Sequence, residues 1–182
     1  MAAIAASGLD KYTSESMAEL DSHKNMIVLG NQALFIQDTG KSAEVNEFSS
    51  NIQGMSKLPV VDAVVTYNCT FSSESYLLVM QNDLHIPSIK YNLIPPFIIR
   101  EAGLTVSKVP NIHCNEPTVE DHTIYDYVTK LRIPLNLDGI SLYLPIQPLT
   151  LEDMERCNKI EHVFLSPDAE TWDPYSDTFD LN

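Results

Sequence analysis

Two short runs contain a carboxylate in a setting where it could act in hydrolysis. The first is Asp21-Ser22-His23, which directly follows Leu20. Two carboxylates held close together share one proton, because like charges at such a distance cannot both be ionised. The ionised carboxylate then takes a proton from water, and the neutral one donates a hydrogen bond to the scissile carbonyl. If Asp21 is one such group, the second must come from elsewhere, and a second copy of the chain could supply it.

The second run is Asp38-Thr39-Gly40, which follows an apolar stretch, residues 34–36. It lies between two expected strands, residues 33–37 and 45–48, where Asp, Thr and Gly are ordinary turn residues. We therefore prefer Asp21 as the catalytic candidate and retain Asp38 as the competing one. Asp21 and Ser22 could also be ordinary turn residues with no catalytic role, since both residue types favour turns and helix caps.

A third group contains residue types that bind metals, namely His113, Cys114 and His122. The spacing of these residues matches no zinc pattern. We expect no metal and no cofactor. The three cysteines form no CxxC pair, and the N-terminus lacks the basic region of a signal peptide. We therefore expect reduced thiols and a cytoplasmic location.

Composition limits the class of partner. The net charge of −14 argues against binding to a nucleic-acid backbone, which requires Lys and Arg. The apolar fraction of 44% is sufficient for a core, and no apolar run is as long as a membrane span. We expect no direct nucleic-acid or membrane partner.

The pattern of elements predicts a mainly β domain. Strands are expected at residues 26–30, 33–37, 59–67 and 75–86, and the last two flank a polar turn typical of a hairpin. Pro95 and Pro96 suit the start of a helix that Gly103 ends. A meander over residues 122–146 and a weak capping box, Thr150 with Asp153, follow. We expect one shared core for seven apolar residues: Val64, Leu77, Val79, Leu93, Ile94, Phe97 and Ile98.

Residues 84–104 resemble the protease of copia-type retrotransposons. The family pattern is an apolar residue and "VPS", a few polar residues, "NLLS", then a helix and a glycine. Here Ile86-Pro87-Ser88 and Asn92-Leu93-Ile94 occupy those positions, and Gly103 ends the helix. The upstream family motif is Asp-Ser/Thr-Gly, which Asp21 and Ser22 match, and His23 stands where glycine is expected.

The resemblance implies a small retropepsin-like closed barrel with one short C-terminal helix, followed by a β-meander. It also implies an aspartic endopeptidase region of a Pol polyprotein that acts on peptide or polyprotein as a homodimer. The catalytic residues would be Asp21 and Ser22. Counting back from Asn92, Asp21 leaves room for two hairpins and a flap at residues 49–57, whereas Asp38 leaves less.

His23 would weaken or abolish activity, because two such loops meet at the dimer axis with no room for a Cβ. The alternative is a non-catalytic retroelement-derived β domain that acts as a binding or structural module. The expected organisation is a disordered N-terminus at residues 1–16 and a β domain with trailing meander at 17–148. A short helix and connector follow at 149–165, and then an acidic disordered tail at 166–182.

Overall fold

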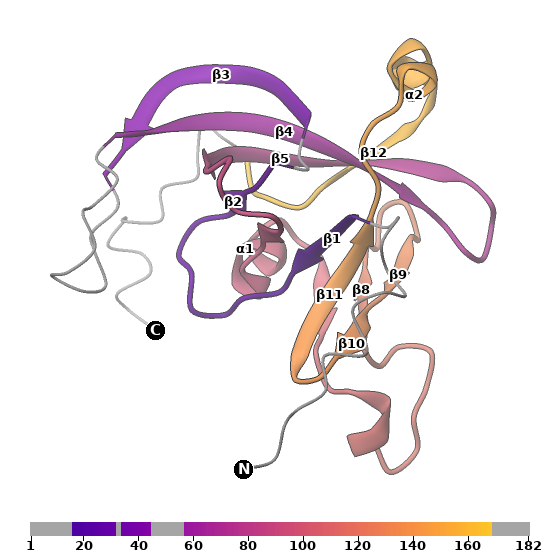
Figure 1. Cartoon of the computed structure of the whole chain (residues 1–182). Helices are drawn as coiled ribbons and strands as arrows, with labels where there is room; N and C mark the ends of the chain where they lie inside the picture. The colour runs from indigo at the N-terminus through magenta and orange to yellow at the C-terminus, as the bar shows by residue number, and fades with distance from the viewer. Residues whose placement is uncertain (1–15, 32–33, 45–56, 169–182) are drawn as a thin grey trace, which may run out of the picture.

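The computed structural model describes residues 16–31, 34–44 and 57–168, and these residues form a mainly β protein with one large mixed sheet and one small sheet (Figure 1). The strands of the large sheet are, in spatial order, β10 (Asn136–Asp138), β11 (Ser141–Ile146), β1 (Ser16–Glu19), β6 (Asn92–Leu93), β2 (Val28–Leu29), β5 (Ser75–His85), β4 (Leu58–Asn68) and β3 (Leu34–Ala43). Strand β12 (Glu161–Phe164) pairs in parallel with β5.

The small sheet is antiparallel and consists of β7 (Thr105–Ser107), β8 (Thr123–Tyr125) and β9 (Arg132–Pro134). The helices are short: α1 (Pro96–Glu101), α2 (Leu151–Arg156), and the 3₁₀ turns η2 (Asn111–His113) and η3 (Cys157–Lys159). No helix in the described part of the chain has the length and apolar character needed to cross a membrane.

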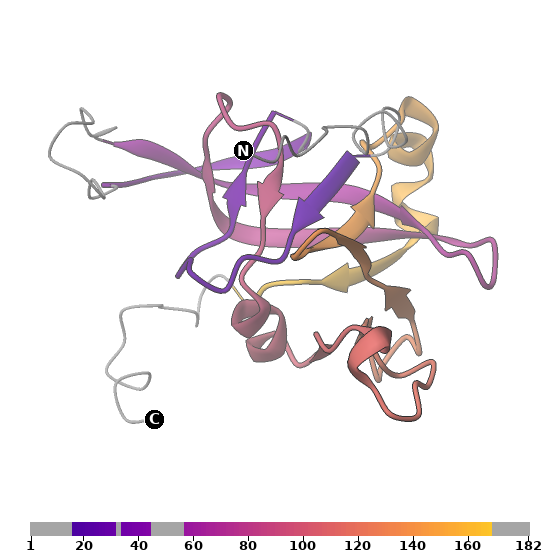
Figure 2. The ribbon, with the colours of Figure 1, turned by 60° about the horizontal axis from the view of Figure 1, so that its bottom comes forward.

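The β4–β5 hairpin confirms the strongest strand prediction and organises the large sheet. Figure 2 shows it running across the width of the molecule, with its tip projecting at one side. The two strands pair from Val60 with Leu84 to Asn68 with Ser75. Both strands have eleven residues, and β4 is rich in β-branched residues, which suit this long pairing.

The large sheet approaches itself at one point, between β4 and β11, each of which is second from an end of the strand order. Thr66 of β4 and Gln147, just after β11, exchange two backbone hydrogen bonds of 2.8 and 2.7 Å. This bridge is isolated, and no closed barrel is found among the described residues. The meander does not form a separate unit, because β11 pairs with β1 and so belongs to the large sheet.

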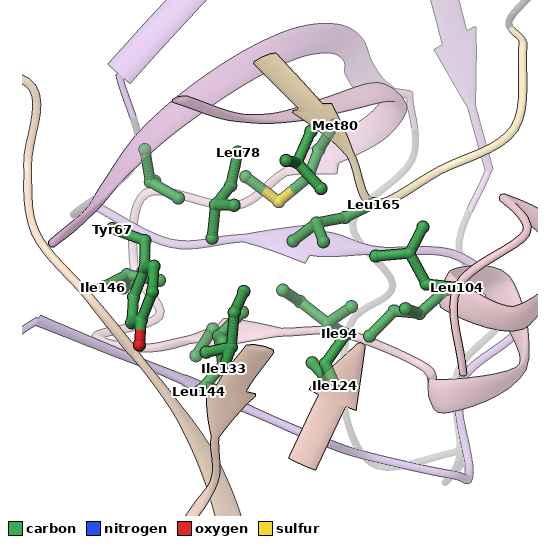
Figure 3. Close-up of a cluster of buried hydrophobic side chains, with 14 of the residues drawn as sticks. Tyr67, Leu78, Met80, Ile94, Leu104, Ile124, Ile133, Leu144, Ile146 and Leu165 are labelled. Carbon is green, nitrogen blue, oxygen red and sulfur yellow. The ribbon is translucent and has the colours of Figure 1, made fainter. Parts of the chain in front are cut away.

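The main core lies between the large sheet, α1 and the small sheet. Figure 3 shows side chains from both sheets directed at one another, with Leu78 and Met80 of β5 facing Ile124 and Ile133 of the small sheet. All four are fully buried. Because successive residues of a strand point to opposite faces, Leu77 and Val79 pack on the other side of β5.

The expected single core is therefore wrong. Ile94 and Ile98 lie in the main core, and Phe97 is only half-buried against it. Val64, Leu77 and Val79 form a second cluster, covered by residues near α2, namely Leu149, Cys157 and Ile160. Leu93 packs against a third hydrophobic cluster, which consists of Val28, Leu58, Val60 and Leu84. The large sheet thus has apolar side chains on both faces. The sequence of its strands therefore does not show which apolar residues share a core.

Helix α1 begins and ends as the sequence predicts. Pro95 is its N-cap and Pro96 its first residue. At its end, Gly103 has a φ of +91°, Gly103 N–H donates to Arg100, and Leu104 N–H donates to Ile99. This pair of hydrogen bonds is a Schellman motif, which needs a residue that adopts the left-handed conformation without strain. The capping box of Thr150 and Asp153 is also formed, at the start of α2.

Two predictions of local structure are wrong. Asp38-Thr39-Gly40 is not a turn, because β3 continues through it and pairs with β4 on both sides, with a register shift between Asp38 and Lys41. The returning strand expected at residues 45–48 lies outside the described residues. Strand β12 was not predicted at all, since residues 149–165 were expected to hold only a helix and a connector.

Candidate functional site

Asp21 lies in the loop that follows β1, next to the segment that starts α1. Its backbone N–H donates to the carbonyl of Ile94 over 3.2 Å, and Ile94 N–H donates to Glu19 over 2.8 Å. These bonds continue the parallel pairing of β1 with β6. The loop is therefore held by strands far apart in the sequence. The Asp21 side chain is 22% exposed, so its carboxylate lies near the surface.

His23 contacts the Asp21 carboxylate through two groups. Its backbone N–H donates to Asp21 Oδ1 over 2.9 Å, and its ring Nδ1 lies 3.3 Å from the same oxygen. The first contact closes a small turn of the kind that Asp favours. The His23 side chain is 93% exposed, so its ring stands on the open surface beside the carboxylate. Ser22 is also exposed.

Asp38 lies in a different setting, on β3. Its Oδ1 accepts the N–H of Gly40 over 2.8 Å, and the neighbouring Thr39 hydroxyl donates to the Val60 carbonyl over 2.6 Å. Gly40 has a φ of +72°, as a glycine bulge requires. In the sheet, β3 is separated from β1 by β4, β5, β2 and β6. Asp21 and Asp38 therefore do not lie on neighbouring strands.

A groove of about 330 Å³ opens beside the Asp21 loop. Its apolar side chains belong to the third hydrophobic cluster. The polar residues His23, Lys24 and Asn25 of the Asp21 loop also line it. Eleven residues line it: His23, Lys24, Asn25, Met26, Val28, Ala43, Glu44, Leu84, Ile86, Ile89 and Leu93. The groove thus combines apolar side chains, such as Val28 and Leu84, with the charged residues Lys24 and Glu44.

The wall of this groove depends on a close approach of two backbones. A Cβ on Gly30 would lie 2.5 Å from the Ile89 carbonyl oxygen and 2.8 Å from that of Tyr91. Gly30 N–H donates to Oδ1 of the fully buried Asn92 over 2.9 Å. Gly30 and Asn92 therefore fix the turn at residues 86–91 against the end of β2, and with it the position of Ile89.

Sequence reasoning missed a buried carboxyl group on β5. Asp83 is 1% exposed, and its Oδ2 has no hydrogen-bond partner in the described structure. Burial, with a smaller contribution from the nearby carboxylate of Asp62, raises the pKa of Asp83 well above its ordinary value of 3.8. Asp83 ends the polar run Gln81-Asn82-Asp83, and such a run does not reveal which of its side chains points inward. No signal in the sequence would have found it.

The remaining candidates add no further group to the site. Residues 49–56 of the expected flap lie outside the described residues. His113 is exposed, and no cluster of three or more His, Cys, Asp or Glu able to hold a metal occurs in residues 16–31, 34–44 and 57–168.

Comparisons with known proteins provide no relative for this chain: no family model matches it, and neither a curated protein nor a solved structure is significantly similar to it.

Proposed function

We propose that this chain is the retropepsin-like aspartic endopeptidase region of a copia-type retrotransposon polyprotein, weakened by His23. Asp21 supplies one carboxylate, Ser22 belongs to the same motif, and a homodimer brings two Asp21 side chains together. The shared proton and the activated water of such a dyad would hydrolyse a peptide bond of polyprotein. In this proposal the β domain forms the closed barrel of that fold.

The position of Asp21 carries the proposal. The two segments that resemble the family, Asp21-Ser22 and residues 84–104, are far apart in the chain, yet Asp21 N–H is hydrogen-bonded to Ile94 immediately before α1. The pairing of β1 with β6 thus brings the two segments together, which is the arrangement that the proposal requires. The apolar groove beside the loop supports a peptide substrate, because it is large enough for a bulky side chain.

The bridge between Thr66 and Gln147 supports the barrel part of the proposal. It brings β4 back to β11, so the six strands β11, β1, β6, β2, β5 and β4 need only a longer ladder at that point to form a ring. In this proposal α1 is the C-terminal helix of that fold.

The second candidate is a non-catalytic retroelement-derived domain, and His23 favours it. Its side chain occupies the surface beside the Asp21 carboxylate, where a second subunit would approach. If that ring keeps the subunits apart, the chain retains an apolar groove that binds peptide and has no dyad to cleave it.

The experiment that tests the first candidate is cleavage of a peptide library at mildly acidic pH by the full chain and two Asp→Asn variants. Asp21→Asn should abolish cleavage, because the dyad then has no base. Asp38→Asn is the matched control and should leave the rate unchanged. Loss of cleavage in Asp38→Asn alone would mean that the other aspartate is catalytic. Sedimentation of the same samples measures whether a dimer is present.

A further inference from the structure

A pocket of about 360 Å³ lies between the tip of the β4–β5 hairpin and the small sheet. This hairpin-tip pocket shares no residue with the groove beside Asp21. The hairpin provides one wall, and the loop before β8, the turn before β9 and β9 itself provide the other. Its lining residues are Cys69, Phe71, Ser72, Tyr76, Val119, Lys130, Leu131 and Arg132.

Hydrogen bonds hold both walls of the hairpin-tip pocket. On the hairpin side, Cys69 N–H donates to the Glu74 carbonyl over 2.8 Å, and Ser73 N–H donates to the Cys69 carbonyl over 3.0 Å. On the other side, Arg132 Nη1 donates to the Val119 carbonyl over 3.0 Å. The pocket is therefore formed by the fold itself, as is usual for sites that bind small molecules.

Apolar side chains of the hairpin-tip pocket are exposed to water. Phe71 is 68% exposed and Val119 is 73% exposed, although both are large apolar residues. Tyr76 and Leu131, which also line the pocket, are buried. Exposed apolar side chains with polar groups around them are typical of a binding site. A ligand with an apolar body would remove part of this surface from water.

The charge of the hairpin-tip pocket differs from that of the rest of the chain. The sequence has 25 Asp and Glu residues against 11 Lys and Arg, yet the charged residues that line this pocket are Lys130 and Arg132. Neither forms an ion pair with a carboxylate of the described residues. By contrast, the groove beside Asp21 is lined by both Lys24 and Glu44, and the hollow near α2 is lined by acidic and basic residues together. The hairpin-tip pocket therefore favours an anion.

The carboxylates that are near in sequence do not line this pocket. Glu74 Oε2 accepts the Tyr76 hydroxyl over 3.1 Å, and Glu74 lines the hollow near α2 instead. Asp126 Oδ1 accepts the N–H of Val128 over 2.9 Å, within the turn before β9. Glu120 is exposed and is not among the lining residues. An anion in the pocket would thus lie beside two cations, with no carboxylate among the lining residues to oppose it.

We propose that the hairpin-tip pocket binds a small amphipathic carboxylate. Its aryl or branched aliphatic body lies against Phe71, Tyr76 and Leu131, and its carboxylate lies beside Lys130 and Arg132. Ammonium and guanidinium groups form charge-assisted hydrogen bonds with carboxylates, and the volume of the pocket suits a ligand of this size. This inference does not depend on Asp21 being catalytic.

The test compares two ligands, 4-phenylbutyrate and 4-phenyl-1-butanol, which have the same apolar body and differ in charge. Each is titrated against the full chain by saturation-transfer NMR, and we expect a Kd on the order of 1 mM for the acid. The acid should bind about threefold to fivefold more tightly than the alcohol, because the cations are partly in water. Bound acid should also slow alkylation of Cys69, which lines the pocket, and leave that of Cys157, near α2, unchanged.

Two variants separate the contributions of charge and apolar surface. Lys130→Glu should remove the preference for the acid over the alcohol. Phe71→Ala should weaken binding of both ligands by about threefold to tenfold. Both side chains are exposed, so both variants should fold, and circular dichroism checks this.

Lys24→Glu is the matched control, since Lys24 is an exposed lysine that lines the groove beside Asp21. It should leave the affinity for both ligands unchanged. The proposal is overturned if wild type binds the acid and the alcohol equally or binds neither. It is also overturned if the preference for the acid persists in Lys130→Glu, if Lys24→Glu loses it equally, or if the acid does not slow alkylation of Cys69.

Discussion

The backbone N–H of Asp21 and the carbonyl of Ile94 are joined by a hydrogen bond of 3.2 Å. The bond fixes the loop after β1 to the residue that precedes the two prolines of α1. The bond therefore holds the loop that carries Asp21 beside the start of the helix.

His23→Gly should raise peptidase activity. The change removes a ring that lies 3.3 Å from the Asp21 carboxylate and keeps the backbone N–H that bonds the same oxygen. If the ring holds two subunits out of position, we expect kcat/KM to rise by roughly tenfold to a hundredfold. Cleavage of a peptide library measures it, with His113→Gly as the control for loss of an exposed imidazole. The absence of cleavage by both wild type and His23→Gly would leave only the binding-module alternative.

Gly30→Ala should be strongly destabilising. Its Cβ would meet the carbonyl oxygens of Ile89 and Tyr91 at 2.5 and 2.8 Å, and these are backbone atoms that cannot move independently. We expect a loss of roughly 2–4 kcal/mol in the free energy of unfolding, measured by urea denaturation. Gly139→Ala is the matched control. Its φ is +61° and the space around it is open, so only about 1–2 kcal/mol should be lost.

Ile98→Ala should cost more stability than Phe97→Ala, although phenylalanine is the larger residue. Ile98 is 2% exposed in the main core, whereas Phe97 is only half-buried at its edge. Removing the buried side chain should cost about 2–5 kcal/mol, and truncation of Phe97 should cost less. Denaturation of the two variants under the same conditions measures this order. The reverse order would show that Phe97 is the central residue of the α1 packing.

Asp83 should make the protein less stable as pH rises. Burial raises the pKa of this carboxyl in the folded state, so between its ordinary value of 3.8 and the higher folded value the unfolded state binds fewer protons. The free energy of unfolding therefore falls with rising pH across that window. Asp83→Asn should remove the part of this pH dependence that Asp83 causes. Relative to the wild type, the variant should therefore gain stability as the pH rises to neutral.

Thermal denaturation from pH 4 to pH 8 measures the slope for wild type and Asp83→Asn. Asp38→Asn, on the exposed part of β3, should leave it unchanged and serves as the matched control. Asp62→Asn should reduce the slope only partly, because the Asp62 carboxylate is the smaller cause of the raised pKa. Equal slopes in wild type and Asp83→Asn would contradict the assignment.

The elements that could be predicted from sequence are those with local signals. Helix α1 has prolines at its start and Gly103 at its end, and both act through backbone geometry within a few residues. The β4–β5 hairpin has two runs that are rich in apolar residues and are joined by a polar turn. In each case the residues that give the signal lie within the element or directly beside it. Contacts with distant parts of the chain therefore did not change the predicted structure.

The failures share a physical cause, which is that pairing with distant strands decides the outcome. Asp, Thr and Gly are common to turns and to glycine bulges, and only the ladder with β4 makes Asp38-Thr39-Gly40 a bulge. Strand β12 has one buried residue, Val163, and it exists because the free edge of β5 accepts it. The burial of Asp83 and the groove beside Asp21 likewise result from the assembled sheet.

The position of β1 has a consequence for how the protein is made. This strand lies between β6 on one side and β11 on the other, and both partners come much later in the chain. During synthesis, β1 leaves the ribosome long before Leu144 and Ile146 exist to pair with it. The β4–β5 hairpin can form early, but the large sheet cannot be completed until β11 and then β12 have emerged. We therefore expect folding to be slow, because completion of the large sheet depends on pairings between distant parts of the chain.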